Sequence, residues 1–152
     1  MAKVNKKLGM NKTKRKTIES MTKKELIKVL YREFSLFIRM SAADDNGFVC
    51  CPTCLRIYHW KDMDCSHYVN RHKMSVRWDE RNVIAQCRSE NRFQSGSIYK
   101  LRQVLVEKYG EEAIKQVEYL AGFNDSSDIF WLREKINEFR KKVKQLKNEK
   151  GV

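Results

Sequence analysis

The sequence predicts an α+β fold in which a small core rich in cysteine and histidine is flanked by N- and C-terminal α-helices. Apolar residues recur at helical spacing before residue 41 and again after residue 97. Between these regions, all five cysteines lie among short β-prone runs. We therefore predict a flexible basic arm at 1–20 and a single domain at 21–150, with a core at 49–100 and C-terminal helices at 97–148.

The first helix is marked by a candidate capping box, in which Thr22 and Glu25 exchange hydrogen bonds. Apolar residues follow at helical spacing as far as about Met40: Leu26, Leu30, Phe34, Phe37 and Ile38. The run from Asp44 to Gly47 then predicts a turn.

Three further helices are predicted in the C-terminal part. The first ends at Gly110, a shorter one is closed by Gly122, and the last begins after an N-cap in 124–127. Its apolar stripe between Ile129 and Leu146 indicates packing on the core. The alternative for this stripe is a dimerising coiled coil, which would make the protein a homodimer.

The charge of the chain indicates a polyanionic partner. Lys and Arg total 32 against 19 Asp and Glu, a net charge of +13, and such an excess favours binding to nucleic acid phosphates. A basic protein without a specific partner is the alternative. No stretch of about 18 apolar residues exists, so we expect no membrane association. The N-terminus lacks the apolar segment of a secretory signal, so we expect a cytoplasmic protein.

The cysteines indicate metal binding rather than disulfides, because their number is odd and Cys51 and Cys54 form a C-x-x-C knuckle. Two intervening residues allow both thiolates to face one tetrahedral zinc ion. A second pair would complete the site, and Cys87 stands where it is expected. The position three residues later is Glu90 rather than a cysteine.

Two predicted strands, at 63–69 and 82–86, are joined by a basic loop at 70–73. His67 ends the first strand, Asn82 begins the second, and Asn91 follows early in the next helix. This order resembles an HNH, or ββα-metal, nuclease core. Such a core needs a histidine to activate water, an asparagine to orient it, and a metal ligand on the helix.

The resemblance becomes specific in the runs 64–68, 77–83, 85–91 and 95–96. They are similar to the phage recombination nuclease family called NinG or Rap, over residues of about 30 to 145 and most strongly from 51 to 96. Members of that family are regarded as structure-selective endonucleases that cut branched DNA, such as junctions, flaps and D-loops, with a divalent cation. The resemblance implies a ββα-metal core stapled by zinc, with other phage recombination proteins as further partners.

The resemblance also implies roles for individual residues. His67 would be the general base, Asn82 would orient it, and the carbonyl oxygen of Asn91 would bind Mg²⁺ or Mn²⁺. Ser66 stands where an oxygen ligand is usual, so Asp64 or Asp79 is expected to substitute. The residues expected to contact DNA are all basic: Arg71, Lys73, Arg77, Arg81 and Arg88.

Glu90 departs from the family pattern, which has cysteine at this position. Zinc held by three thiolates and Glu90 is one expectation, and a weakened or absent zinc site is another. A third is recruitment of Cys50 or Cys65 as the fourth ligand. Two functions are considered in the light of Glu90. One is an active nuclease on branched DNA, and the other is a zinc-knuckle DNA-binding protein whose cleavage is weak or absent because of Glu90. A general HNH nicking endonuclease on duplex DNA is the third function considered.

Overall fold

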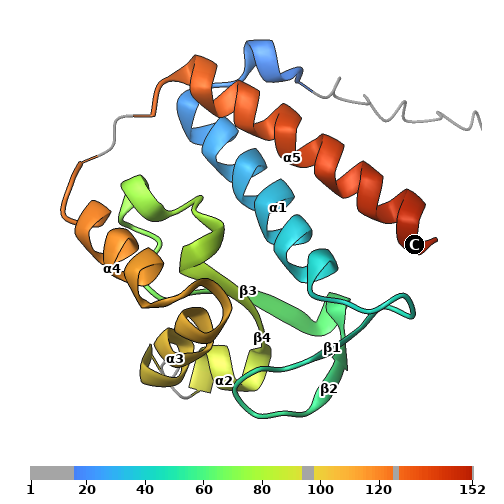
Figure 1. The fold of residues 1–152 in the computed structure, drawn as a ribbon. Helices are drawn as coiled ribbons and strands as arrows, with labels where there is room; N and C mark the ends of the chain where they lie inside the picture. The colour runs from blue at the N-terminus through green and yellow to red at the C-terminus, as the bar shows by residue number, and fades with distance from the viewer. Residues whose placement is uncertain (1–15, 94–97, 125–126, 152) are drawn as a thin grey trace, which may run out of the picture.

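The computed structural model describes residues 16–93, 98–124 and 127–151 (Figure 1). The first fifteen residues of the predicted basic arm and the Ser95-Gly96-Ser97 segment lie outside these ranges. The last residues of the arm, Ile18–Ser20, form a 3-10 turn, and Arg133 donates hydrogen bonds to the backbone carbonyls of Ile18 and Glu19. None of the helices in the described ranges has the length and apolar composition needed to cross a bilayer.

Helix α1, Lys23–Ser41, begins with the predicted capping box. The Glu25 amide donates to Thr22 Oγ1 at 3.3 Å, and the Thr22 amide donates to Glu25 Oε2 at 2.8 Å. The helix ends one residue beyond the predicted position. In the turn that follows, the Asp44 carboxylate accepts hydrogen bonds from the amides of Asn46 and Phe48. Both local predictions are therefore confirmed.

Helix α5, Ile129–Lys150, lies along α1, as Figure 1 shows. Its buried stripe packs on α1, where the Phe139 ring meets Phe34 edge to face at 5.1 Å. The prediction that this stripe packs on the core is confirmed. Its N-cap is Asp128, whose carboxylate accepts the Trp131 amide at 2.8 Å. The prediction of an N-cap in 124–127 was wrong. The Asp128 side chain caps the free amides at the start of the helix, so the helix begins at Ile129.

Two antiparallel hairpins lie next to this helix pair. Strand β3, Met63–His67, pairs with β4, Val83–Cys87, so that His67 is opposite Val83 and Met63 is opposite Cys87. The two predicted strands are confirmed, with ends shifted by one or two residues. Strand β1, Phe48–Cys50, pairs with β2, Ile57–His59. This hairpin was not predicted, and it presents the C-x-x-C knuckle at its turn.

Helix α2, Arg88–Phe93, begins directly after β4, so β3, β4 and α2 follow one another along the chain. Helices α3, Ile98–Tyr109, and α4, Glu111–Leu120, have the predicted ends. They cover β4, where Leu101, Leu105 and Ile114 pack on Ile84. The structure is thus α+β, with a cysteine cluster beside two small antiparallel sheets.

The α1–α5 contact predicts a test of the fold. Phe139→Ala should lower the free energy of unfolding by about 4 kcal/mol, because it leaves a cavity beside Phe34. Phe130→Ala, on the same helix but with a side chain that is 75% exposed, should change it by no more than about 0.5 kcal/mol. Chemical denaturation of both variants measures the difference, and equal effects would contradict this packing.

Candidate active site and metal centre

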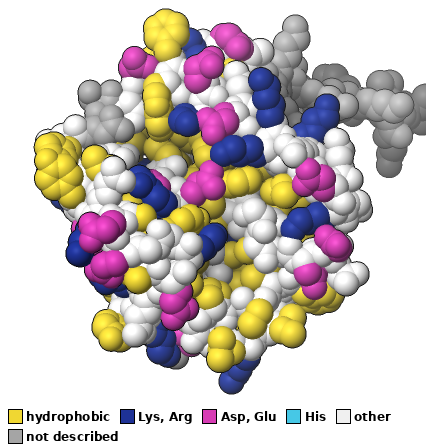
Figure 2. Space-filling model, in the orientation of Figure 1, with side chains coloured by type: hydrophobic (Ala, Val, Ile, Leu, Met, Phe, Trp, Pro, Cys, Tyr) yellow, Lys and Arg dark blue, Asp and Glu magenta, His cyan; other side chains and the backbone are white. Residues whose placement is uncertain are grey.

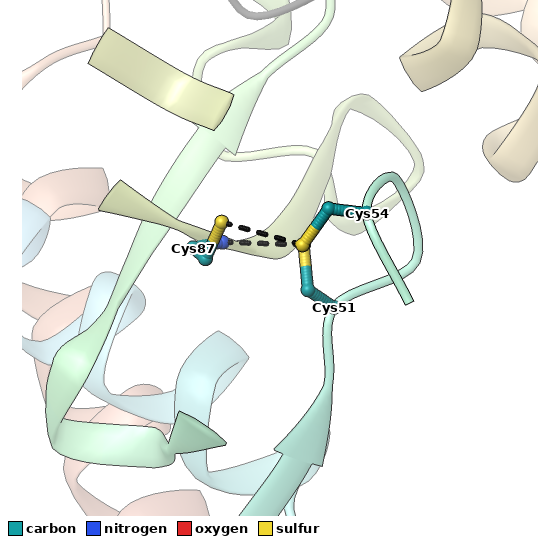
Figure 3. A group of neighbouring side chains, drawn as sticks. All are labelled: Cys51, Cys54 and Cys87. Atoms are coloured by element: carbon teal, nitrogen blue, oxygen red, sulfur yellow. Dashed lines mark hydrogen bonds between the residues drawn. The ribbon is translucent and has the colours of Figure 1, made fainter. Parts of the chain in front are cut away.

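Three cysteines from two separate segments converge at the end of β4. Cys51 and Cys54 come from the β1–β2 knuckle and face Cys87 (Figure 3). Their sulfur atoms all lie within 4.8 Å of one another, and Cys54 Sγ is 3.7 Å from Cys87 Sγ. The predicted thiol ligands are therefore brought together. Three convergent sulfurs form a donor set that suits a soft or borderline ion such as zinc.

Hydrogen bonds to Cys51 favour its thiolate form. Burial raises the pKa of this thiol, but the Cys87 amide, the Thr53 hydroxyl and neighbouring amides lower it more, to about 7. The Cys87 amide lies 3.5 Å from Cys51 Sγ. Because metal ions bind thiolates, this arrangement prepares the knuckle for metal binding.

Glu90 lies in the first turn of α2 and is only 7% exposed. Its Oε2 atom is buried and forms no hydrogen bond with any described residue. A buried carboxylate without a partner is costly, which is the condition that a nearby cation would relieve. The carboxylate is nevertheless not part of the tight three-sulfur cluster. Glu90 thus stands beside the cluster as a candidate fourth ligand.

The structure does not bring the other two cysteines to the cluster. Cys65 packs in the core against α1 residues, and burial raises its pKa to about 12. Cys50 is exposed on β1. Neither belongs to the three-sulfur group, so the expectation that one of them completes the site is not supported by this arrangement.

His67 ends β3, and its orientation is set by the loop that follows. Its Nε2 lies 3.0 Å from the Arg77 carbonyl oxygen. A carbonyl only accepts, so Nε2 carries the proton and Nδ1 is left with a lone pair in the neutral ring. Tyr31 of α1 stacks on the imidazole at a centroid distance of 6.3 Å. Burial lowers the His67 pKa, and the nearby Arg77 and Arg71 charges add to this effect.

Asn82 is fully buried and holds the β3–β4 loop rather than the His67 ring. Its Oδ1 accepts the Val69 amide at 2.7 Å, and its Nδ2 donates to the carbonyls of Val69 and Val76 at 3.0 Å. Arg77, which binds His67, follows Val76 directly. Asn82 therefore positions His67 through the loop backbone.

Asn91 projects from α2 toward β3. Its Oδ1 accepts the Ser66 hydroxyl at 2.9 Å, and its Nδ2 donates to Asp64 Oδ2 at 3.0 Å. Asp64 also pairs with Arg92 at 3.0 Å. The three oxygen-bearing side chains Ser66, Asp64 and Asn91 thus meet at the β3–α2 contact, where hard divalent cations would find oxygen donors.

One pocket of about 370 Å³ brings several predicted site residues together. The lining of this pocket, which we call the His67 pocket, is Tyr31, Cys65, His67, Asn70, Arg71, His72 and Asn91. Asp79 is not among these residues. It borders a different pocket and forms a two-oxygen contact with Arg81. Of the two carboxylates expected near the site, the structure places only Asp64 beside Asn91.

The five predicted DNA-contacting residues differ in their availability. Arg71 and Lys73 are exposed in the basic loop. Arg77 is partly buried, with its guanidinium 4.7 Å from the Trp78 ring centroid. Arg81 is engaged by Asp79 and Gln116, and Arg88 lies near Asp62 and Asp64. Arg71 is the member that lines the His67 pocket.

Sequence reasoning missed Tyr31. It lines the His67 pocket, stacks on the imidazole, and lies within 6 Å of the Arg71 and Arg77 guanidinium carbons, at 5.9 and 5.6 Å from its ring centroid. Within its predicted helix Tyr31 looked like an ordinary partly buried aromatic residue. No local pattern marks it, because its partners come from a distant loop.

The Asn82 hydrogen bonds predict a large loss of stability in Asn82→Ala. The change leaves three backbone groups of the loop without their partner, so we expect a loss of about 3 kcal/mol in the free energy of unfolding. Asn70→Ala, in the same loop but exposed, should cost less than about 1 kcal/mol. Denaturant titration measures both, and a small loss in Asn82→Ala would show that the loop does not depend on this side chain.

The position of Glu90 predicts the outcome of restoring cysteine. Glu90→Cys should raise the affinity for zinc and the Tm of the zinc-loaded protein, by about 3 °C for each kcal/mol gained. Ser89→Cys adds a thiol at the neighbouring exposed position and should do neither. Chelator competition and thermal melts with and without zinc measure these effects. If the two variants behaved alike, position 90 would not be a ligand position.

Comparisons with known proteins identify the family of the chain. A family profile described as "Bacteriophage Lambda NinG protein" matches residues 2–149. "Protein ninG" of Salmonella phage P22 is 28% identical over 93 residues, which cover 58% of this chain and 43% of that protein. The chain thus matches less than half the length of this relative. No solved structure shows a significant match. Because the profile spans nearly the whole chain, the protein belongs to the phage NinG family.

Proposed function

We propose that this protein is a metal-dependent DNA endonuclease of phage recombination, selective for branched DNA, with β3, β4 and α2 as an HNH-type core. The observation that carries the proposal is the His67 pocket. A histidine whose Nε2 is held by a backbone carbonyl, an amide oxygen and an arginine meet there. This is the set of groups needed to activate water, bind a cation and hold a phosphate.

His67 is suited to act as the general base. The hydrogen bond to the Arg77 carbonyl holds the proton on Nε2, so Nδ1 can accept one from water. The lowered pKa keeps the ring neutral at neutral pH. The water oxygen would then attack phosphorus, and the bond to the leaving oxygen would break. Arg71, exposed at the rim of the pocket, would hold the phosphate.

The oxygens of Asn91 and Asp64 would hold Mg²⁺ or Mn²⁺. Both side chains belong to the β3–α2 contact, and Ser66 and Arg92 orient them. Such an ion, when bound, stabilises negative charge on the phosphate and on the leaving oxygen. The three-thiol cluster would hold a structural zinc next to the start of α2, the helix that carries Asn91.

The substrate part of the proposal rests on charge and family. The net charge of +13 favours a polyanion, and the resemblance to phage recombination nucleases indicates branched DNA. Other phage recombination proteins, and a second copy of the chain, remain predicted partners. The α5 stripe that suggested a coiled coil is packed on α1, so a homodimer would need a different surface.

The buried Glu90 Oε2, which has no hydrogen-bond partner among the described residues, favours a second candidate function, a zinc-knuckle protein that binds DNA with weak or no cleavage. A weakened zinc site would loosen the start of α2 and hence the position of Asn91. A general HNH endonuclease that nicks linear duplex DNA is the remaining alternative, since the His67 pocket contains nothing specific to a branch point.

Cleavage of a labelled four-way junction or flap with Mg²⁺ or Mn²⁺ tests the proposal. His67→Ala should reduce the rate by about 100-fold or more, because it removes the general base. The matched control is His59→Asn. His59 caps a 3-10 turn outside the pocket, and Asn is also a good capping residue, so cleavage should be retained.

Junction binding without cleavage that depends on His67 and metal would favour the DNA-binding module instead. Equal cleavage of the junction and of a linear duplex of the same sequence would favour the general nicking enzyme.

A further inference from the structure

A second pocket of about 410 Å³ adjoins the His67 pocket. The two pockets share four residues, Tyr31, Cys65, Arg71 and Asn91. Beyond this shared border, the second pocket is lined by Ser35, Arg39, Met63, Asp64, Arg88 and Arg92. We call it the arginine pocket, because four of its ten lining residues are arginines. They come from α1, from the β3–β4 loop and from α2.

The arginine pocket has an excess of positive charge. Asp64 is the single carboxylate in its lining, and it pairs with Arg92 Nε at 3.0 Å and more loosely with Arg88 Nε at 3.9 Å. Asp62, outside the lining, also lies 3.8 Å from Arg88 Nη1, so the four guanidinium groups outnumber these two carboxylates by two. On the face shown in Figure 2, Lys and Arg side chains are interspersed with Asp and Glu.

Arg39 is held in place but not neutralised. Its Nε donates to the Ser35 carbonyl at 3.1 Å, and its guanidinium carbon lies 5.6 Å from the Trp60 ring centroid. Within the described residues, its terminal nitrogens form no hydrogen bond, and no carboxylate lies within salt-bridge distance of them. A guanidinium oriented in this way keeps donors free for an anion with several acceptor oxygens.

We propose that the arginine pocket binds the DNA backbone phosphate next to the one that lies at His67, with Arg39 and Arg92 as its main contacts. This inference rests on the proposed function and extends it. Phosphate is favoured because it offers oxygens to several arginine forks at once and because Arg71 borders both pockets. Two adjacent sites that share an arginine match a chain of successive phosphates.

Asp64 acts as the resident counter-ion of this pocket. With no DNA bound it engages Arg92 and Arg88, and an entering phosphate competes for the same donors. Asp64→Asn removes the charge of this side chain and keeps its shape, so it should strengthen phosphate binding. This direction is opposite to that of the arginine variants, and a gain in affinity cannot come from misfolding.

The test is binding of a labelled four-way junction in EDTA, measured across a series of salt concentrations, so that no cleavage is needed. Arg39→Gln and Arg92→Gln should each weaken binding by about tenfold. Each should also reduce the slope of log K against log salt by about 1. Asp64→Asn should strengthen binding by about threefold, from the removal of one competing charge.

The matched controls carry the same charge changes outside the pocket. The controls are Arg32→Gln and Asp45→Asn. Arg32 lies on α1 like Arg39 but lines neither pocket, and Asp45 lies in an exposed turn. Circular dichroism and Tm measurements confirm that each variant is folded.

The inference is supported if both arginine variants lose more junction affinity than Arg32→Gln does. It also requires that Asp64→Asn gain more affinity than Asp45→Asn does. Pocket variants that behave like their controls would overturn it, even if junction cleavage remained dependent on His67. Absence of junction binding by the unchanged protein would overturn both the inference and the proposed function. Arginine-dependent binding without cleavage would support the inference and count against the enzyme alone.

Discussion

The segment between β3 and β4 is tied together by one buried side chain. Asn82 accepts the Val69 amide and donates to the carbonyls of Val69 and Val76, so it closes both ends of the loop. The next residue after Val76 is Arg77, whose carbonyl binds His67. Polar backbone groups inside a protein are costly when unpaired. Asn82 therefore makes one loop conformation much more favourable than others, and that conformation sets the direction of the histidine.

Electrostatics at this site follow from the same loop. Burial disfavours the charged form of His67, and the guanidinium groups of Arg71 and Arg77 disfavour it further. The groups that would attract a phosphate thus also keep the histidine neutral. An approaching phosphate would partly offset the arginine charges, so the two sides of the proposed chemistry are coupled by charge.

Helix α2 links the two candidate centres. Cys87 ends β4, Glu90 lies in the first turn of the helix, and Asn91 reaches back to β3. A metal ion held by the three thiols would fix the β4–α2 junction and thus the position of Asn91. Glu90 is buried at this junction, and its Oε2 has no hydrogen-bond partner among the described residues. Glu90, which stands where the family resemblance predicts cysteine, is therefore next to the residue that would bind the proposed catalytic ion.

Much of this protein follows from local sequence. The Thr22–Glu25 capping box, the Asp44 turn and the glycine after α3 require only neighbouring residues. The amphipathic stripe of α5 and the C-x-x-C knuckle near Cys87 can also be predicted from the sequence. The spacing of the stripe places its side chains on one helix face, and the spacing of the knuckle places its thiols around one point. The order of His67, Asn82 and Asn91 predicted a shared site, and two of these residues line one pocket.

Tertiary structure decided which partners these residues have. It placed Asp64 beside Asn91 and turned Asp79 toward Arg81, so that only one of the two aspartates expected near the site lies there. It also brought Tyr31 and Arg39 of α1 to the two pockets, and it directed Asn82 to the loop backbone instead of the histidine ring. The physical reason is the sequence separation of the contacts. Caps, turns and periodic faces depend on contacts between residues a few positions apart, whereas the partners of the site residues depend on how α1 and α2 pack on β3.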